Sequence, residues 1–390
     1  MLAAAAELVP ALRSEYAAQH SRRVEDADEE IFLLYSLSRP DPGRRGLGHV
    51  EIWSDLLRVT VKLRDIEPYH QQDDSAIAPG VSVEPVDAAE ADPVARRSKV
   101  STQKTGKGKK DVKAKQGGPS HVEAYIWQSQ TSLRSQRGNT GSVMWRSSIL
   151  LGATMVRQHV NKAPLVNASG DPVPSLLDWT CNGASRDLCV LELGAGTGVL
   201  SAILHSSTIF KAGQGTVTWV ATDQEALLLL LRKNINFVCD ASLQTSPQAM
   251  ALDWTQVRDA VQLTKRQPSA LRTVLRDIHA PFGKHSLQDD LPFRPADIVV
   301  AVDCIFNPSL FPAFLDTLTA LCHPEFTVVF VLVELREQAM MHDFLSAWVE
   351  HRHPTQESAQ WAIWSIEGSA LGLEGLQKGY ACFVAYLTLT

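Results

Sequence analysis

The sequence predicts an α/β protein whose mostly parallel sheet is covered by helices on both faces. From residue 188 onward, apolar runs of strand length alternate with segments of helical length, and this alternation is typical of such sheets. In the clearest unit, a strand at 188–193 is followed by Gly194, Gly196 and Gly198 and then by an apolar helix. Glycine suits a turn that takes positive φ or that a ligand approaches closely. We therefore expect a ligand cradle at this turn.

The other elements follow in order along the chain. Strands are predicted at 188–193, 217–222, 250–252, 297–302, 326–334, 361–366 and 380–388, and helices at 145–160, 225–238, 309–321 and 336–350. The last two strands are expected to form an antiparallel hairpin. The segment 161–187 is predicted to be a polar connection, and 255–295, with its several prolines, an irregular insertion.

Acidic residues stand at the ends of the strands around the glycine turn. Glu192 precedes the first glycine, where a carboxylate would repel a pyrophosphate docked on the helix start. No Gly-Lys-Ser/Thr ending follows, which disfavours a triphosphate cradle. Asp223 ends the next strand, where it can accept hydrogen bonds from a ribose diol. This pattern favours a positively charged nucleoside ligand.

Five sequence marks occur in a characteristic order. They are Trp145, E-L-G-A-G-T-G at 192–198, T-D at 222–223, L-D-W at 252–254 and D-C-I-F-N at 303–307. Together they resemble methyltransferase family 16, a branch of the S-adenosylmethionine-dependent methyltransferases. The resemblance implies a seven-stranded, Rossmann-like methyltransferase sheet over residues 141–390, with S-adenosylmethionine as cofactor.

The resemblance also implies roles for the residues of the glycine turn and its neighbours. Gly194, Ala195 and Gly196 would pass beside the methionine portion of the cofactor. Glu192 would face the methionine ammonium, directly or through water, and Asp223 would bind the ribose hydroxyls. The plainer alternative for Glu192 is a partner for a local basic group.

Four further residues are matched to the family pattern. Trp254 and Val302 would form walls of the adenine pocket and the adjoining cleft, or would be ordinary core residues. Trp145 would cover the cofactor, where an aromatic face attracts a sulfonium, or would pack a helix. Asp303 would orient the incoming lysine or accept its proton, with helix capping as the structural alternative. Phe306 replaces the family's frequent Tyr, so no hydroxyl is available there.

The first 140 residues are predicted to form a small helical and β-rich extension. We expect helices at 7–20 and 25–37 and strands at 50–53, 57–63 and 121–127, the last two pairing with each other. The segment 67–119 lacks hydrophobic periodicity and is predicted to be a disordered insertion. Its basic run at 96–115 is interpreted as a solvated loop, with a nuclear-import signal or a weak RNA-contacting arm as alternatives.

Composition excludes several function classes. The net charge of −6 argues against binding of nucleic acid over the whole surface. Glu7, Pro10 and Arg13 interrupt the apolar start before a secretory core forms, and no membrane span is expected. The six cysteines include no C-x-x-C pair, which disfavours a zinc site and a disulfide framework. We expect a monomeric cytoplasmic protein, with a nuclear fraction as an alternative, and no metal.

Within this resemblance, the segment 132–135 (S-L-R-S), the basic insertion and the Trp-led helix are most similar to the fungal ribosomal lysine N-methyltransferase 5 group. The implied activity is protein-lysine N-methylation, with a large-subunit ribosomal protein, the L-one protein of the stalk, as substrate. Two alternatives stay open: a methyltransferase acting on a small amine or a nucleic acid, and an inactive binding protein with the same fold.

Overall fold

A computed structural model provides the fold of the chain. It describes residues 21–37, 48–64, 77–87, 120–135, 140–161, 165–166, 172–173, 187–207, 217–238, 247–264, 267, 269–283, 294–324, 326–353, 358–367 and 379–389. The predicted helix at 7–20, the basic run at 96–115 and most of the connection at 161–187 lie outside these residues.

The central sheet has eight strands in the order β1-β12-β13-β11-β10-β7-β8-β9. Their bounds are β1 (Ser21–Arg23), β7 (Leu188–Leu193), β8 (Val217–Asp223), β9 (Gln248–Ala251), β10 (Ile298–Val302), β11 (Val328–Glu334), β12 (Ala359–Ile366) and β13 (Tyr380–Leu389). Strands β11, β10, β7, β8 and β9 run parallel, whereas β13 lies antiparallel to both β11 and β12. The seven predicted strands and the closing hairpin are confirmed.

Strand β1 is an addition that the sequence pattern did not reveal. It pairs antiparallel with β12, so that Ser21 lies opposite Ile366 and Arg23 opposite Trp364. Three polar residues are too short a run to show the alternation of a strand. The pairing follows from the neighbouring helix α3 (Ala27–Leu37), whose docking on the sheet brings this segment to the free edge of β12.

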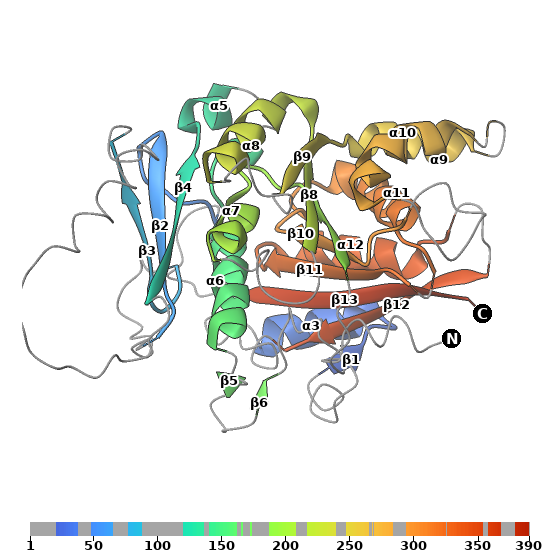
Figure 1. Ribbon diagram of the computed structural model, residues 1–390. Helices are drawn as coiled ribbons and strands as arrows, with labels where there is room; N and C mark the ends of the chain where they lie inside the picture. Colours follow the sequence, from blue (N-terminus) through green and yellow to red (C-terminus); the bar gives the residue numbers. More distant parts are fainter. Residues whose placement is uncertain are drawn as a thin grey trace, which may run out of the picture.

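Helices cover both faces of the sheet (Figure 1). One face carries α6 (Arg146–Asn161), α7 (Val199–Ser206) and α8 (Glu225–Val238), and the other carries α3, α9 (Trp254–Leu263), α10 (Ser269–His279), α11 (Phe311–Leu321) and α12 (Gln338–Glu350). Alternate residues of β7 point to opposite faces: Val190 belongs to the first core and Leu191 to the second. Because helices cover both faces of the sheet, every residue of β7 is buried.

The predicted irregular insertion at 255–295 is wrong for much of its length, because it contains α9 and α10. Leu271, Leu275 and Ile278 recur at helical spacing along one side of α10 and pack into the second core. The prolines misled the prediction because they flank these helices: Pro281, for example, lies in the short 3-10 turn Ala280–Phe282 that follows α10.

A second, three-stranded antiparallel sheet lies on the other side of α6 and α7 (Figure 1). It contains β2 (Leu56–Lys62), β3 (Val81–Pro85) and β4 (His121–Trp127), in the order β3-β2-β4. The predicted pairing of 57–63 with 121–127 is confirmed. Strand β3, however, lies within the segment predicted to be disordered, and it pairs with β2 so that Val83 lies opposite Val59.

The predicted strand at 50–53 is absent. Its neighbour His49 makes an isolated bridge with Trp145, and the amide of Val50 donates to the carbonyl of Met144. This segment therefore joins the loop before α6 instead of a sheet. The remaining elements are short: α5 (Gln130–Ser135), the 3-10 turns η2 (Thr140–Ser142) and η6 (Pro308–Leu310), and the pair β5 (Leu165–Val166) and β6 (Pro172–Val173).

The small sheet shares a core with the large one. Val59 and Ile126 of the small sheet belong to the same buried cluster as Leu200 and Ile203 of α7.

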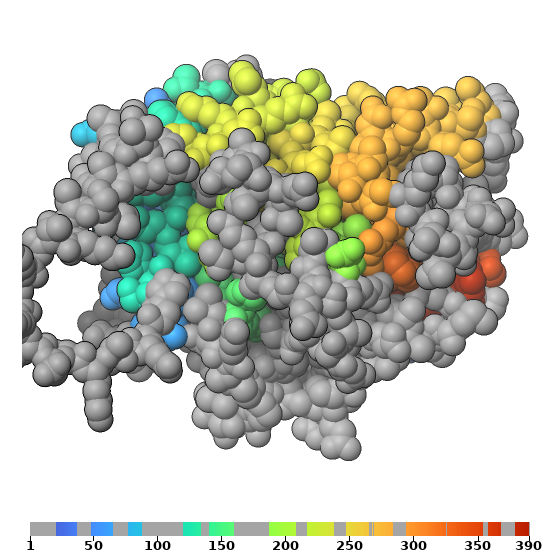
Figure 2. Space-filling view, viewed as in Figure 1, coloured from blue at the N-terminus to red at the C-terminus, as the bar shows by residue number. Residues whose placement is uncertain are grey.

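In Figure 2, the yellow-green to orange segments from α8 to α11 cover the upper part of this face of the molecule. The described cysteines, Cys189, Cys304, Cys322 and Cys382, are buried thiols. No helix among the described residues is both long and apolar enough to cross a membrane.

Candidate functional site

The glycine turn between β7 and α7 has the backbone conformation that its sequence predicts. Gly194, Gly196 and Gly198 have φ of 62°, 57° and 73°, in the left-handed region that disfavours residues with a side chain. A Cβ on Gly194 would lie 2.8 Å from the sulfur of Cys304. Glycine at this position therefore keeps open the space that the turn borders.

Asp223, the last residue of β8, is tied to the same turn. Its Oδ2 accepts a hydrogen bond from the amide of Gly196 at 2.7 Å, and its Oδ1 accepts one from the amide of Gln224 at 2.8 Å. Burial raises the pKa of the Asp223 carboxyl to about 6. At neutral pH the group is thus an anion with oriented oxygens at the tip of a strand.

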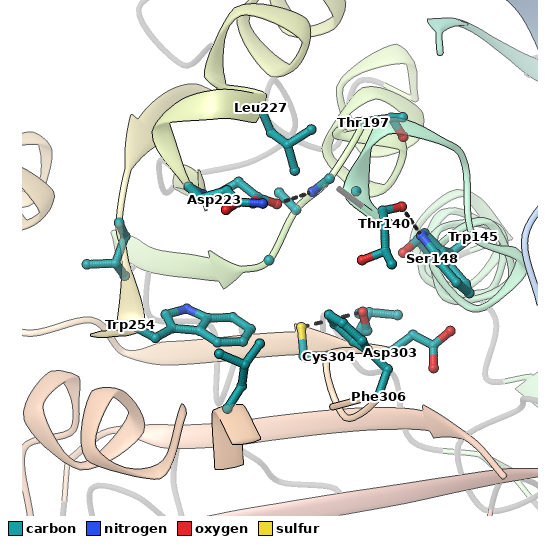
Figure 3. Close-up of a pocket in the computed structure, with 18 of the residues that line it drawn as sticks. Thr140, Trp145, Ser148, Thr197, Asp223, Leu227, Trp254, Asp303, Cys304 and Phe306 are labelled. Carbon is teal, nitrogen blue, oxygen red and sulfur yellow. Dashed lines mark hydrogen bonds between the residues drawn. The ribbon is translucent and has the colours of Figure 1, made fainter. Parts of the chain in front are cut away.

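These residues border a cavity of about 350 Å³ at the carboxyl ends of the parallel strands. The predicted residues that line it are Trp145, Gly194, Ala195, Gly196, Asp223, Trp254, Val302 and Asp303. Figure 3 shows Asp223 and Trp254 on opposite sides of the open space, with Trp145 and Asp303 toward its other end. The cavity therefore has two ends with different chemistry.

At one end, Trp254 supplies a flat apolar wall. It begins α9, after Asp253 caps the helix by accepting a hydrogen bond from the amide of Thr255 at 2.8 Å. The Trp254 ring packs edge-to-face on Phe314, with 5.0 Å between ring centroids. This support fixes the indole beside the cavity, where a planar heterocycle could lie against it.

At the other end, Trp145 lies just before α6. Its indole Nε1 donates to the carbonyl of Thr140 at 3.0 Å, and His49 packs against the ring at 6.0 Å between centroids. The guanidinium carbon of Arg336 lies 5.2 Å from the ring centroid. A cation–π contact is thus already present in the protein itself.

Asp303 follows β10 and lies beside Trp145 at this second end. Arg336 binds its carboxylate in a bidentate manner, with Nη1–Oδ1 and Nη2–Oδ2 distances of 3.0 and 2.6 Å. Among the described non-glycine residues, Asp303 alone has positive φ, at 57°. The predicted helix-capping alternative belongs instead to Asn307, whose side chain accepts from the amide of Ser309 at 3.1 Å.

Glu192 is the predicted site residue that the structure does not bring to the cavity. It is 2% exposed, it is absent from the cavity lining, and its Oε2 accepts a hydrogen bond from the indole of Trp219 at 2.9 Å. Burial raises the pKa of the Glu192 carboxyl to about 8. A carboxyl that is protonated at neutral pH offers no charge to an ammonium, so direct contact with the cofactor is not supported.

The structure adds site residues that the sequence analysis missed. Thr140 and Gly141 line the cavity because the loop before Trp145 packs on the glycine turn. A Cβ on Gly141 would lie 3.1 Å from the Cα of Gly196 and would clash with Leu227. In the sequence, the available signal was Gly141, shortly before Trp145. Its contact residue Gly196, however, is distant along the chain.

Asn234 is a second residue that sequence reasoning missed. Asn234 is fully buried in α8. Its side-chain nitrogen donates to the carbonyls of Trp127 and Thr197, both at 2.8 Å, and its side-chain oxygen accepts from the backbone amide of Trp127 at 2.7 Å. The end of β4 is thereby connected to the glycine turn. In sequence, an Asn inside an apolar helix gives no sign of which backbone it will bind.

The residues of this cavity fit a nucleoside with a positively charged sulfur. The turn has no Cβ at Gly194 or Gly196, Asp223 presents carboxylate oxygens for a diol, and Trp254 offers an apolar face.

In the described part of the chain, no group of three or more His, Cys, Asp or Glu residues could hold a metal ion.

Comparison with known proteins adds independent information. The sequence profile of a family described as lysine methyltransferase matches residues 128–268 and 282–350. Two curated proteins named ribosomal lysine N-methyltransferase 5 are similar to this chain. The one from Eremothecium gossypii is 25% identical over 56% of this chain and 70% of that protein. The one from Kluyveromyces lactis is 27% identical over 58% and 71%.

A third curated relative carries a different name. It is a diaminohydroxyphosphoribosylamino-pyrimidine deaminase from Schizosaccharomyces pombe, 26% identical over 56% of this chain. The match spans only 40% of that protein's length. Zinc deaminases bind their metal through a P-C-x-x-C segment, which this sequence lacks, so the name gives no reason to expect deamination here.

Likeness to solved structures is low in overall superposition. The methyltransferase domain of the citrinin polyketide synthase matches with a TM-score of 0.27 and 15% identity, over 52% of this chain and 47% of that one. The family profile, in contrast, covers more than half of the chain and includes the glycine turn, Asp223, Trp254 and Asp303. The chain belongs to the lysine methyltransferase family, whose methyl donor is S-adenosylmethionine.

Proposed function

We propose that this protein transfers a methyl group from S-adenosylmethionine to a lysine side chain of a large-subunit ribosomal protein, the L-one protein of the stalk. The observation that carries the proposal is that one cavity is lined by Asp223 and Trp254, which suit a nucleoside, and also by the acidic residue Asp303. The names of the two fungal relatives support the ribosomal substrate. We place the reaction in the cytoplasm, with the nucleus as an alternative.

Each end of the cavity has a distinct task. Asp223 would bind the ribose hydroxyls, the glycine turn would let the backbone approach the methionine portion, and Trp254 would cover the adenine. When bound, the cofactor supplies a methyl group on a positively charged sulfur. The open space beside Asp303, Phe306 and Trp145 receives the lysine side chain.

Lysine must lose a proton before its nitrogen can accept a methyl group, because its unperturbed pKa is about 10.4. The Asp303 carboxylate attracts the ammonium and sets its direction. Its bidentate pairing with Arg336 stabilises the anion, so Asp303 is better suited to orienting the nitrogen than to removing its proton. Burial of the amine in this enclosed end would lower its pKa, so that its proton passes to solvent before the methyl group is transferred, and alignment would contribute much of the acceleration.

The proposal is tested with ribosomal subunits from a strain that lacks this enzyme. Incubation with labelled cofactor should label one lysine of the large subunit, and mass spectrometry should find the same site unmodified in that strain. The Asp223→Ala variant is the matched control and should transfer no label. Label in RNA or in a small amine would instead support those acceptors. Tight binding of S-adenosylhomocysteine without any transfer would indicate an inactive binding protein.

A further inference from the structure

Three charged side chains form a cluster at the Asp303 end of the cavity, where Asp303 lines the cavity and contacts Arg336, which in turn contacts Glu334. Arg336 contacts Asp303 through two hydrogen bonds and lies 3.4 Å from the Glu334 carboxylate. The Asp303 and Glu334 side chains are 1% and 9% exposed, whereas the Arg336 side chain is 20% exposed. The Asp303 carboxylate is the one that presents negative charge to an incoming cation at the cavity wall.

Arg336 also contacts the opposite wall of this end. Its guanidinium lies over the Trp145 ring, whose other contacts, the hydrogen bond to Thr140 and the packing of His49, hold the indole in place. One side chain thereby sets the distance between the carboxylate of Asp303 and the indole of Trp145.

The backbone of Asp303 needs such support. A residue with a side chain at φ of 57° is strained, and its amide is held by the carbonyl of Leu332 at 2.7 Å. The fork of Arg336 fixes both carboxylate oxygens at once, which a lysine ammonium cannot do because it is a point charge without a planar pair of donors. A carboxylate has about four acceptor positions. The two donors of Arg336 and the amide of Glu334, which donates to Oδ1 at 3.4 Å, leave room for one further donor.

The N-terminal extension encloses the cluster from outside. Gly48 has φ of 91°, and a Cβ there would clash with the Glu334 carboxylate and lie 2.8 Å from Nη2 of Arg336. The amide of Arg146 donates to the carbonyl of Gly48 at 3.0 Å, which ties this backbone to the start of α6. Arg336 therefore has little freedom to leave the site.

We infer that Arg336 is a positioning residue for the acceptor lysine. It holds the Asp303 carboxylate and the Trp145 indole as the two walls of the acceptor end, and the held carboxylate attracts the ammonium. The inference rests on the proposed lysine methylation, and it concerns the acceptor side of the cavity, because Arg336 contacts Asp303, Glu334 and Trp145.

The test compares Arg336→Lys and Arg336→Met with the wild type. Both variants should lower kcat for the ribosomal acceptor, by at least 10-fold for Arg336→Lys and more for Arg336→Met. The dissociation constant of S-adenosylhomocysteine, measured by calorimetry, should stay within 3-fold. Gly48→Ala, which disturbs the cluster from outside the cavity, should also lower kcat and leave that dissociation constant unchanged. Arg58→Lys, at the exposed Arg58–Glu84 pair of the small sheet, is the matched control and should behave as wild type.

The outcomes separate the two proposals. If the wild type transfers methyl groups and Arg336→Lys does so with unchanged kcat and KM, the positioning role is wrong while the proposed function stands. A parallel loss of S-adenosylhomocysteine binding and kcat would also overturn it, because Arg336 would then support the cofactor end. Absence of transfer by the wild type to any lysine would overturn the proposed function and this inference with it.

Discussion

At the scale of single residues, two carboxyls that look alike in the sequence have different environments. Asp223 faces the cavity and accepts two backbone hydrogen bonds, whereas Glu192 lies beneath it against Trp219. Burial raises the pKa of both carboxyls, to about 6 and about 8 respectively. Only Asp223 is an anion at neutral pH, so only Asp223 can recognise the ribose by charge-assisted hydrogen bonds.

Asp223→Asn should weaken S-adenosylhomocysteine binding about 10- to 100-fold, since a hydrogen bond to a charged group contributes about 1.5–3 kcal/mol. Because burial raises the pKa of Asp223 to about 6, wild-type affinity should fall as the pH is lowered through 6 and the carboxylate becomes protonated. Calorimetry between pH 5 and 8 measures both effects. The variant should show a flatter pH profile, and an equally steep one would assign the titration to another group.

Glu192→Gln should stabilise the fold at alkaline pH. The pKa of Glu192 is raised to about 8 in the folded state from an ordinary value of 4.5. The folded state binds this proton more tightly than the unfolded chain, so the associated stability is present below pH 4.5 and is lost as the pH rises through 8. Melting temperatures at pH 5 and pH 9 should therefore differ less in the variant than in the wild type. An identical difference in both proteins would contradict the buried, uncharged state of Glu192.

At the scale of elements, the cofactor cradle is built from segments on either side of residue 140. The turn η2 packs Gly141 on Gly196 of the glycine turn, and Asn234 of α8 connects that turn to the end of β4. The cradle is therefore not formed by the strand–turn–helix unit alone. Changes in η2 and α8 should affect cofactor binding even though neither contains a predicted site residue.

Gly141→Val should lower cofactor affinity by at least about 10-fold, because its side chain meets Leu227 and the backbone of Gly196 and pushes the turn aside. Gly283→Ala is a control away from the cradle. Gly283 has positive φ, at 75°, and a Cβ there has no neighbour within 4 Å. This control should cost about 1–3 kcal/mol of stability from backbone strain and leave affinity unchanged. Equal affinities for the two variants would show that η2 does not shape the cradle.

Asn234→Asp removes the donors that the carbonyls of Trp127 and Thr197 need, without changing the size of the side chain. Leaving buried carbonyls unpaired costs about 1–3 kcal/mol each, so the melting temperature should fall and cofactor affinity should weaken. Asn236→Asp, on the exposed side of the same helix, should change neither. If the two variants had equal melting temperatures and equal cofactor affinities, the hydrogen bonds that connect β4 to the glycine turn would not contribute to stability or binding.

At the scale of the whole molecule, the two sheets enclose one shared core. Val59 and Ile126 from the small sheet pack with Leu200 and Ile203 of α7, which in turn covers the large sheet. A division of the chain at residue 140 stays a prediction, and the continuous core indicates that the two parts depend on each other. At the opposite edge, β1 extends the large sheet beyond β12.

Ile126→Ala should therefore destabilise the whole molecule, by about 2–5 kcal/mol for a fully buried side chain. Calorimetric unfolding should show one transition in both the wild type and the variant, with equal calorimetric and van't Hoff enthalpies. Leu389→Ala, at an exposed position of β13, is the control and should change the unfolding free energy little. Two resolved transitions, with only one of them moved by Ile126→Ala, would support separate domains.

Much of the fold could be predicted because it depends on local patterns. A pattern of about a dozen residues or fewer is enough to predict each of the seven strands, the helix at 225–238 and the glycine turn. Helices α9 and α10 were missed because prolines beside them were interpreted as interruptions. Strand β3 was missed because its alternation is short and lies between polar segments.

The sequence by itself determined the seven strands from 188 onward, the glycine turn with its acid at the next strand tip, and the family to which the chain belongs, because each is encoded by short local patterns along the chain. Only the tertiary structure decided which acid faces the cavity, that Gly141 and Asn234 support the turn, and that Arg336 clamps Asp303. Those contacts join residues 27 to 107 positions apart. Their geometry depends on how the sheet twists and packs, and no local pattern carries that information.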